Sequence, residues 1–206
     1  MRYLWILGAL TLMLLTGCSS MRIVDSDVVS VAAAPPGMNL QGATYRFERL
    51  PSQVNNPEVG LAEQQAQAAM AAVGLVRNDA AAQLSVLVGF SGSKYFADPW
   101  GRPIAPGFYP GWTPYGSIFM GRGLGSYGGL GIGMGMRLPP PPQYLREVSL
   151  IMRDLKSGQV VYETRASHDG PWSDSVQIFS TLFQAALANF PHPPAGPRRV
   201  NIEIPR

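Results

Sequence analysis

Five segments of the chain carry apolar residues in patterns typical of β-strands. They alternate apolar with polar positions, or they form short runs rich in Val, Leu, Ile and aromatic residues between turn-forming stretches. The segments are 44–49, 84–90, 144–155, 159–167 and 200–204. Between the third and the fourth, Asp154–Gly158 has the composition of a hairpin loop, because glycine takes positive φ at low cost. The pattern therefore predicts a hairpin at this point and an edge strand at 200–204.

Two further segments have the features of helices. Residues 58–73 are rich in Ala, Gln and Leu, which are strong helix formers, and Gly74 stands where a helix-ending glycine is expected. Residues 172–189 carry an apolar stripe at helical spacing that includes Phe179 and Phe183, and Pro191 follows. We expect a helix over each segment.

The order of these elements predicts the fold class. We expect an α+β two-layer sandwich, in which a mixed or antiparallel sheet of about four to five strands is covered by two helices. The elements place a single domain at 42–206. Residues 18–41 show little periodicity and include a run of alanines and prolines, so we expect a tether before the domain.

A long insertion rich in Gly, Pro and aromatic residues interrupts the pattern at 93–143. Loops of this length inside a compact domain are uncommon, and the leading expectation is a mobile hairpin extension. One alternative is that its aromatic faces stack on sugars. The residues proposed for that contact are Trp100, Tyr109, Trp112 and Tyr115. Another is a glycine zipper, because glycine recurs at every fourth position over 121–133.

The N-terminus has the features of a bacterial lipoprotein signal. Arg2 precedes an apolar run that is shorter than the roughly 20 residues of a membrane span. The run ends in Leu15, Thr16, Gly17 and Cys18, which resembles a lipobox. We expect residues 1–17 to be cleaved and Cys18, the only cysteine, to carry lipid. Ser19 then favours the outer membrane, on its periplasmic face, because an Asp at that position is the inner-membrane retention signal in enterobacteria.

Composition narrows the classes of function. The net charge is only +3 and no Lys/Arg cluster longer than Arg198-Arg199 occurs, so no nucleic-acid footprint is present. His168 and His192 are the only histidines, and both are expected in solvated turns or loops. The G-x-G-x-x-G match at 123–128 lacks the flanking strand and helix of a dinucleotide site. We therefore expect no catalytic residues, no metal and no cofactor.

The assembled pattern resembles a known family. The segments that carry the resemblance are a lipobox ending at Cys18, an aromatic strand at 44–47, a helix ending at Gly74-Leu75, a strand after Asp79, the hairpin at 154–162 and a helix ending at 189–191. In this order they resemble the bacterial lipoproteins of the domain-of-unknown-function family DUF4136, over about residues 42–192. The resemblance implies a fold and supplies no catalytic residues.

The expected function is accordingly a non-enzymatic one. We expect a membrane-anchored periplasmic domain that binds or scaffolds a component of the cell envelope, either a protein or peptidoglycan. The alternative is a carbohydrate- or peptidoglycan-contacting module that uses the aromatic insertion. A hydrolase would need ionisable groups converging in a cleft, which the sequence does not indicate.

Overall fold

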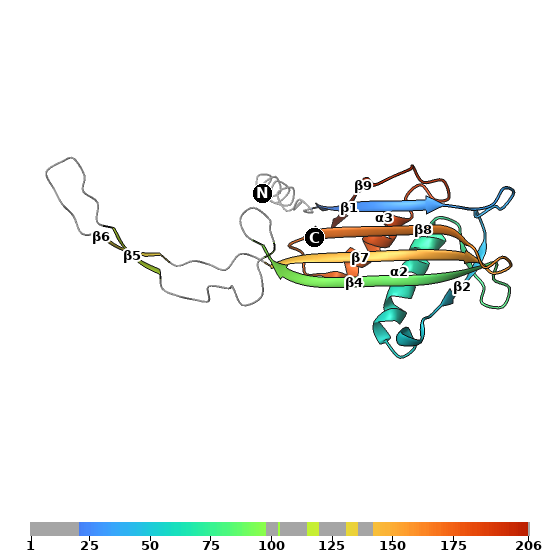
Figure 1. Cartoon of the computed structure of the whole chain (residues 1–206), viewed down its shortest axis with the longest axis horizontal. Coiled ribbons are helices and arrows are strands. Elements are labelled where there is room, and N and C mark those ends of the chain that lie inside the picture. Colours follow the sequence, from blue (N-terminus) through green and yellow to red (C-terminus); the bar gives the residue numbers. More distant parts are fainter. Residues whose placement is uncertain (1–20, 98–102, 104–114, 120–130, 136–141, 206) are drawn as a thin grey trace, which may run out of the picture. The chain divides into compact units, whose positions relative to one another are not determined.

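The computed structural model describes residues 21–97, 103, 115–119, 131–135 and 142–205, with 115–119 and 131–135 described in backbone only (Figure 1). Backbone contacts group the chain into two compact units. The first comprises Met1–Ser91, Arg146–His168 and Asp174–Arg206, and the second comprises Gly92–Leu145 and Asp169–Ser173. The predicted signal peptide and lipobox, at 1–18, lie outside the described residues.

A seven-stranded mixed sheet forms the framework, with strand order β3-β2-β4-β7-β8-β1-β9. Its strands are β1 (Met21–Ala32), β2 (Thr44–Glu48), β3 (Val76–Arg77), β4 (Leu84–Phe96), β7 (Pro142–Asp154), β8 (Val160–Gly170) and β9 (Arg198–Pro205). β2 runs parallel to β3 and β4, whereas β1 runs antiparallel to β8 and β9. The α+β class is confirmed, but the predicted sheet of four to five strands is too small, because β1 and the short β3 were not foreseen.

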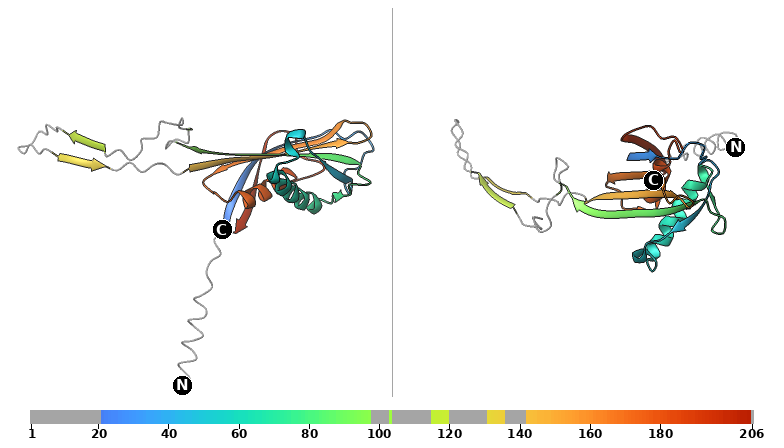
Figure 2. Two further views of the ribbon diagram at one scale, coloured as in Figure 1. Left: turned by 90° about the horizontal axis from the view of Figure 1, so that it is seen from below. Right: turned by 45° about the vertical axis from the view of Figure 1, so that its right-hand side comes forward.

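Two α-helices cover one face of this sheet, and among the described residues no helix lies on its other face (Figure 2). They are α2 (Pro57–Ala72) and α3 (Ser175–Ala186), and a short 3-10 turn, η1 (Pro51–Gln53), precedes α2. Phe90 of β4 packs edge-on against Phe179 of α3, with ring centroids 6.1 Å apart. The core between the layers contains fully buried Val86, Leu150 and Phe183.

Local sequence signals account for the helix boundaries. The Asn56 side chain accepts a hydrogen bond from the Glu58 amide at 2.9 Å, and Pro57 occupies the first turn. Gly74 follows α2 with a φ of 89°, as its role as a helix terminator predicts. The predicted helix at 58–73 is confirmed to within a residue at either end. α3 is shorter than the predicted 172–189, because it begins after Asp174.

The predicted hairpin is confirmed between β7 and β8. The Asp154 carboxylate accepts hydrogen bonds from the Ser157 amide at 2.9 Å and from its hydroxyl at 2.7 Å. These bonds favour the ionised form and lower the pKa of Asp154. Gly158 takes a φ of 72°, which an L side chain would resist. The local sequence therefore specifies the geometry of this turn, and a bond from the Leu155 amide to the Gln83 carbonyl at 2.9 Å attaches it to the neighbouring strand.

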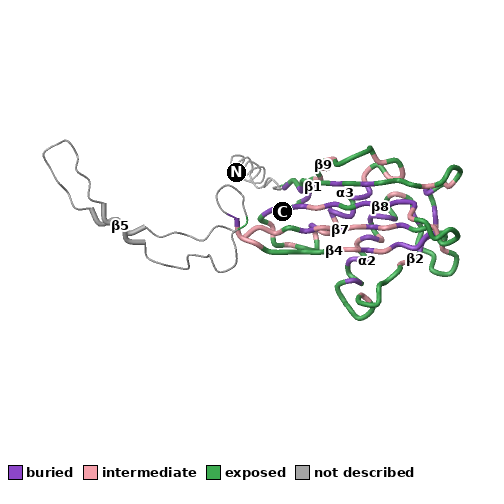
Figure 3. The backbone as a smooth tube through the Cα atoms, viewed as in Figure 1, coloured by how far each residue is buried: buried purple, intermediate pink, exposed green. Residues whose placement is uncertain are grey.

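The expectation of a tether running to residue 41 is wrong for 21–32, which form β1. This strand pairs with β9 over Met21–Val28 and with β8 over Asp27–Ala32, so it joins β9 to the rest of the sheet. Its residues alternate strictly between buried and exposed from Met21 to Ser30 (Figure 3). The tether was expected because neither face of β1 is uniformly apolar.

In the insertion, the described backbone includes a two-stranded antiparallel ladder of β5 (Tyr115–Phe119) and β6 (Gly131–Gly135). This pairing agrees with a hairpin. It contradicts the glycine-zipper alternative at Gly133, which lies in a strand opposite Ser117. The other glycines of that series lie outside the described residues.

The register of β1 is testable with a matched pair of isosteric substitutions. Val28 is fully buried and Val29, its neighbour, is 44% exposed on the opposite face. Val28→Thr places a hydroxyl in the core and should lower the free energy of unfolding by about 1–3 kcal/mol. Val29→Thr should change it by less than about 0.5 kcal/mol. Urea denaturation of both variants measures the difference, and equal effects would refute the register.

Candidate binding site

The structure describes few of the residues predicted to contact a ligand. Trp100, Tyr109 and Trp112 lie outside the described residues, as do Leu15, Thr16, Gly17 and Cys18. Tyr115 begins β5, where its backbone pairs with Gly135. No geometry for a sugar contact can therefore be built from these aromatic residues, and the site is sought on the described sheet.

The face of the sheet without helices carries an apolar row along β1. The row consists of Ile23, Val29 and Val31, which are 55%, 44% and 57% exposed. Alternation places them on one side of the strand, together with Asp25 and Asp27. We call this row the β1 apolar row. Val29 and Val31 are successive outward positions, and such exposed branched aliphatic side chains are a candidate contact surface.

Charged residues border the β1 apolar row on both neighbouring strands. Val29 lies opposite Arg165 of β8, and Ile23 lies opposite Glu203 of β9. Two ion pairs lie on the same face: Arg165 is 3.5 Å from Glu147, and Arg199 is 3.3 Å from Asp27. These pairs are exposed and contribute little to stability. They surround the apolar row with charges of both signs.

The opposite side of β1 faces the start of α3 and is held there by a polar cluster. Arg22, 9% exposed, binds the Asp174 carboxylate through both terminal guanidinium nitrogens, one of them at 2.9 Å. It also donates to the Gln177 side chain at 2.9 Å. Arg146 of β7, 2% exposed, donates to the Ser175 hydroxyl at 3.2 and 3.1 Å. Two buried guanidinium groups thus fix the first turn of α3 against the sheet.

A second polar group secures the other end of α3. Thr164 of β8 donates to the Ala186 carbonyl at 2.8 Å and lies 2.7 Å from the Ser30 hydroxyl. Arg198 of β9 donates to Ser30 at 3.1 Å and to the Ala188 carbonyl at 3.0 Å. A cation at the carbonyl end complements the helix dipole. Side chains of β1 and β7 therefore hold the start of α3, and side chains of β8 and β9 hold its end.

The prediction that His168 is a solvated turn residue is wrong. It lies in β8 with 4% of its surface exposed, and its Nδ1 is 2.7 Å from the Asp25 carbonyl. Because a carbonyl only accepts hydrogen bonds, Nδ1 donates. The β8–β1 ladder reaches only as far as Asp27, so the imidazole bonds to the strand two residues beyond it. His192, by contrast, is exposed in a loop, as predicted.

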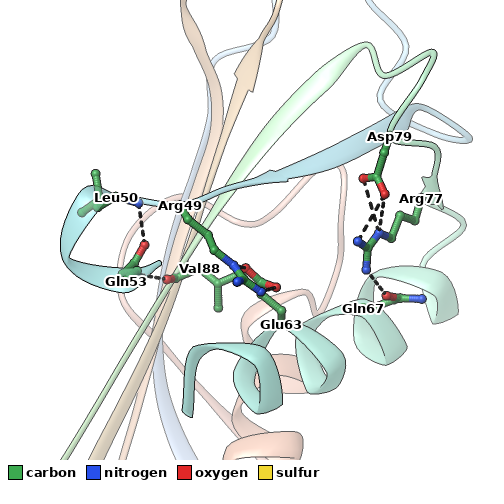
Figure 4. Close-up of polar contacts among 8 residues, drawn as sticks. All are labelled: Arg49, Leu50, Gln53, Glu63, Gln67, Arg77, Asp79 and Val88. Atoms are coloured by element: carbon green, nitrogen blue, oxygen red, sulfur yellow. Dashed lines mark hydrogen bonds and ion pairs between the residues drawn. The ribbon is translucent and has the colours of Figure 1, made fainter. Parts of the chain in front are cut away.

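Ion pairs and hydrogen bonds connect α2 to β3 and to the loops that follow β2 and β3 (Figure 4). Arg49 binds Glu63 of α2 through two nitrogens, at 2.7 and 2.6 Å, and only 9% of the Glu63 side chain is exposed. Arg77 bonds to Asp79 at 3.2 Å and to Gln67 at 3.0 Å. These contacts support the helix layer and lie away from the β1 apolar row.

An open cavity of 480 Å³ lies beside the end of β1, lined mainly by small and apolar residues. Its lining residues are Ala32, Ala34, Pro35, Gly37, Met38, Asn39, Leu40, Pro191 and His192. In the part of the chain that the structure describes, no three His, Cys, Asp or Glu side chains come together to hold a metal ion. Over the same residues, no helix is long and apolar enough to cross a membrane.

The residues that sequence reasoning missed share one origin. The β1 apolar row, Arg22 and the interior position of His168 all depend on β1 being a strand. The signal was the alternation of residues 21–31, in which serines and an arginine stand at inward positions. Because the inner face of β1 is partly polar, the sequence lacks the alternation of apolar and polar residues by which a strand is normally recognised.

The pH dependence of stability tests the cluster at the start of α3. Arg22, and Arg146 to a lesser degree, hold the pKa of Asp174 below its usual 3.8. A carboxyl with a lowered pKa stabilises the fold above the unfolded-state pKa, and this contribution is lost as pH falls through the lower folded-state value.

Asp174→Asn should therefore flatten the loss of stability below about pH 4. At pH 7 it should cost about 1–2 kcal/mol, less than the loss of a fully buried pair, because the Asp174 side chain is 38% exposed. Asp79→Asn, which breaks an exposed pair, is the control and should cost less than about 0.5 kcal/mol. Thermal melts from pH 2.5 to 7 measure both, and parallel curves for wild type and Asp174→Asn would contradict the assignment.

Comparisons with known proteins find similar solved structures and a matching family model. A PDZ domain protein from Parabacteroides distasonis superposes with a TM-score of 0.51 at 12% identity over 96% of this chain, which spans 42% of that protein's chain. A PelC dodecamer from Paraburkholderia phytofirmans gives a TM-score of 0.44 at 12% identity, over 79% of this chain and 95% of its own. No curated protein matches the sequence. The family model for the domain of unknown function DUF4136 matches residues 34–192, and the chain belongs to that family.

Proposed function

We propose that this chain is a periplasmic lipoprotein, anchored by lipid on Cys18, that binds a protein of the cell envelope through the β1 apolar row. The anchor rests on the lipobox-like residues Leu15–Cys18 and on the short apolar run before them. Ser19 favours the outer membrane as its location. The binding role is non-enzymatic and rests on one observation, the exposed Ile23, Val29 and Val31 on a sheet face without helices.

A protein partner suits this surface better than a small molecule. Small ligands bind in concave sites that enclose most of their surface, whereas the β1 apolar row lies on a sheet face and has charged neighbours. An apolar centre with a polar rim is the usual arrangement of a protein interface. Val29 and Val31 form the apolar centre, and Arg165, Glu147, Arg199 and Asp27 supply the rim that separates them from Ile23. A peptidoglycan contact through Trp100 and Trp112 is the alternative outcome of the tests below.

The anchor is tested by removing its thiol. In Cys18→Ser no sulfur is available for the diacylglycerol, so the protein should no longer incorporate labelled palmitate. Because cleavage at a lipobox follows lipidation, the variant should also keep residues 1–17. Palmitate labelling and intact-mass measurement check both results. A Cys18→Ser protein that still takes up palmitate, or that is cleaved after residue 17, would disprove the anchor.

The binding surface is tested by photo-crosslinking in intact cells. A photoreactive amino acid at Val31 should capture one defined protein, because the side chain is exposed within the β1 apolar row. The matched control is Leu61 of α2, which is also apolar and is 45% exposed on the helix layer. Mass spectrometry identifies the adducts.

Val29→Lys should abolish the Val31 adduct and leave the protein folded, whereas Leu61→Lys should not. The same protein captured from both positions would contradict a dedicated surface. Capture of glycan fragments that disappears with Trp100→Ala would favour the peptidoglycan alternative.

A further inference from the structure

The start of β1 follows the predicted lipid anchor almost immediately. Only Ser19 and Ser20 separate Cys18 from Met21, the first residue of β1. Three residue steps span at most about 11 Å of extended chain. The sheet therefore begins where a tether was expected. As long as the first residues of β1 stay paired, the domain remains within this distance of the lipid.

Several contacts hold those first residues in place. The ladder to β9 pairs Met21 with Pro205 and Arg22 with Ile204. The buried Arg22 guanidinium binds Asp174 and Gln177 of α3. Releasing this segment as extra tether would break the ladder to β9 and the half-exposed ion pair between Arg22 and Asp174, and both losses oppose the release.

Apolar residues gather at the same end of the first unit. Met21 and Ile23 are about half exposed, and Pro205 is exposed beside them. Val176, in the first turn of α3, is 59% exposed. The neighbouring Gln177 donates to the Pro205 carbonyl at 3.3 Å, which brings the start of α3 to the end of β9.

We propose that lipid on Cys18 places this end of the sheet, formed by Met21, Val176 and Pro205, directly against the bilayer surface that carries the anchor. The bonds of Arg22 to Asp174 and Gln177 act as the clamp that keeps β1 from unravelling into a tether. The inference rests on the lipid anchor proposed above. The partner at this end is the phospholipid headgroup layer, because only three residue steps separate the lipid-bearing Cys18 from Met21.

This orientation places the β7–β8 turn far from the membrane. The turn lies at the Ala32 end of β1, where the Ala33 amide bonds to the Val161 carbonyl at 2.9 Å. β1 has 12 residues, which at 3.3 Å each amounts to about 40 Å of strand. Figure 1 shows the start of β1 and the β7–β8 turn at opposite ends of the sheet. The open cavity near Ala32 is then directed to the periplasm.

Fluorescence quenching by lipid measures this orientation. Because Cys18 is the only cysteine, an introduced cysteine is the one reactive thiol of the lipidated protein. Glu203→Cys places a fluorophore at the β1–β9 end, and Lys156→Cys places it at the β7–β8 turn; both positions are exposed. The full-length lipidated protein is reconstituted in phosphatidylethanolamine and phosphatidylglycerol vesicles that contain headgroup-spin-labelled lipid.

The expected result is a loss of fluorescence at position 203 and little loss at 156. Inserting a 20-residue Gly/Ser spacer after Ser20 should remove the difference while the fold is retained. Arg22→Gln should reduce the quenching at 203 by releasing the start of β1.

Equal quenching at the two positions, with intact-mass measurement showing lipid on Cys18, overturns this inference and leaves the anchor standing. A protein without lipid on Cys18 overturns the anchor and the inference together.

Discussion

The pairing of β1 is the constraint on which the first unit depends. The first half of the strand bonds to β9 and the second half to β8, and the two ladders overlap only at Asp27 and Val28. β9 therefore belongs to the sheet only through β1. The inner face of β1 meets α3, and its outer face bears the β1 apolar row. The sheet edge, the helix layer and the proposed binding surface are thus linked through one strand.

The interior that β1 helps to enclose is unusually polar at its two ends. Arg22 and Arg146 meet the first turn of α3, while Thr164 and Arg198 meet its last carbonyls. Burying such groups is costly unless each is bonded, so they hold the helix in one position and one register. Aliphatic residues such as Leu182 and Phe183 fill the middle of the layer. The polar ends orient α3, and the apolar middle provides most of the stability.

Elements specified by local sequence were predictable, and those specified by distant pairing were not. The Asp154–Gly158 turn and the helix predicted at 58–73 carry their own signals, and both are confirmed. β1 was missed because Arg22, Ser26 and Ser30 point inward while Ile23 and Val29 point outward. Its inner polar groups are tolerated because α3, β8 and β9 supply partners for Arg22 and Ser30. His168 was misplaced because β8 continues to Gly170, through residues whose sequence resembles a turn.

Amide hydrogen exchange tests the central claim, that the chain is locked into the sheet from its first described residues. The amides of residues 22–28 that bond to β9 should exchange only with global unfolding, at the rates of the buried amides of β8. Protection should begin immediately after Ser20. Rapid exchange over 22–28, with β8 still protected, would show that this segment is a tether after all, and would contradict both the fold assignment and the clamp built on Arg22.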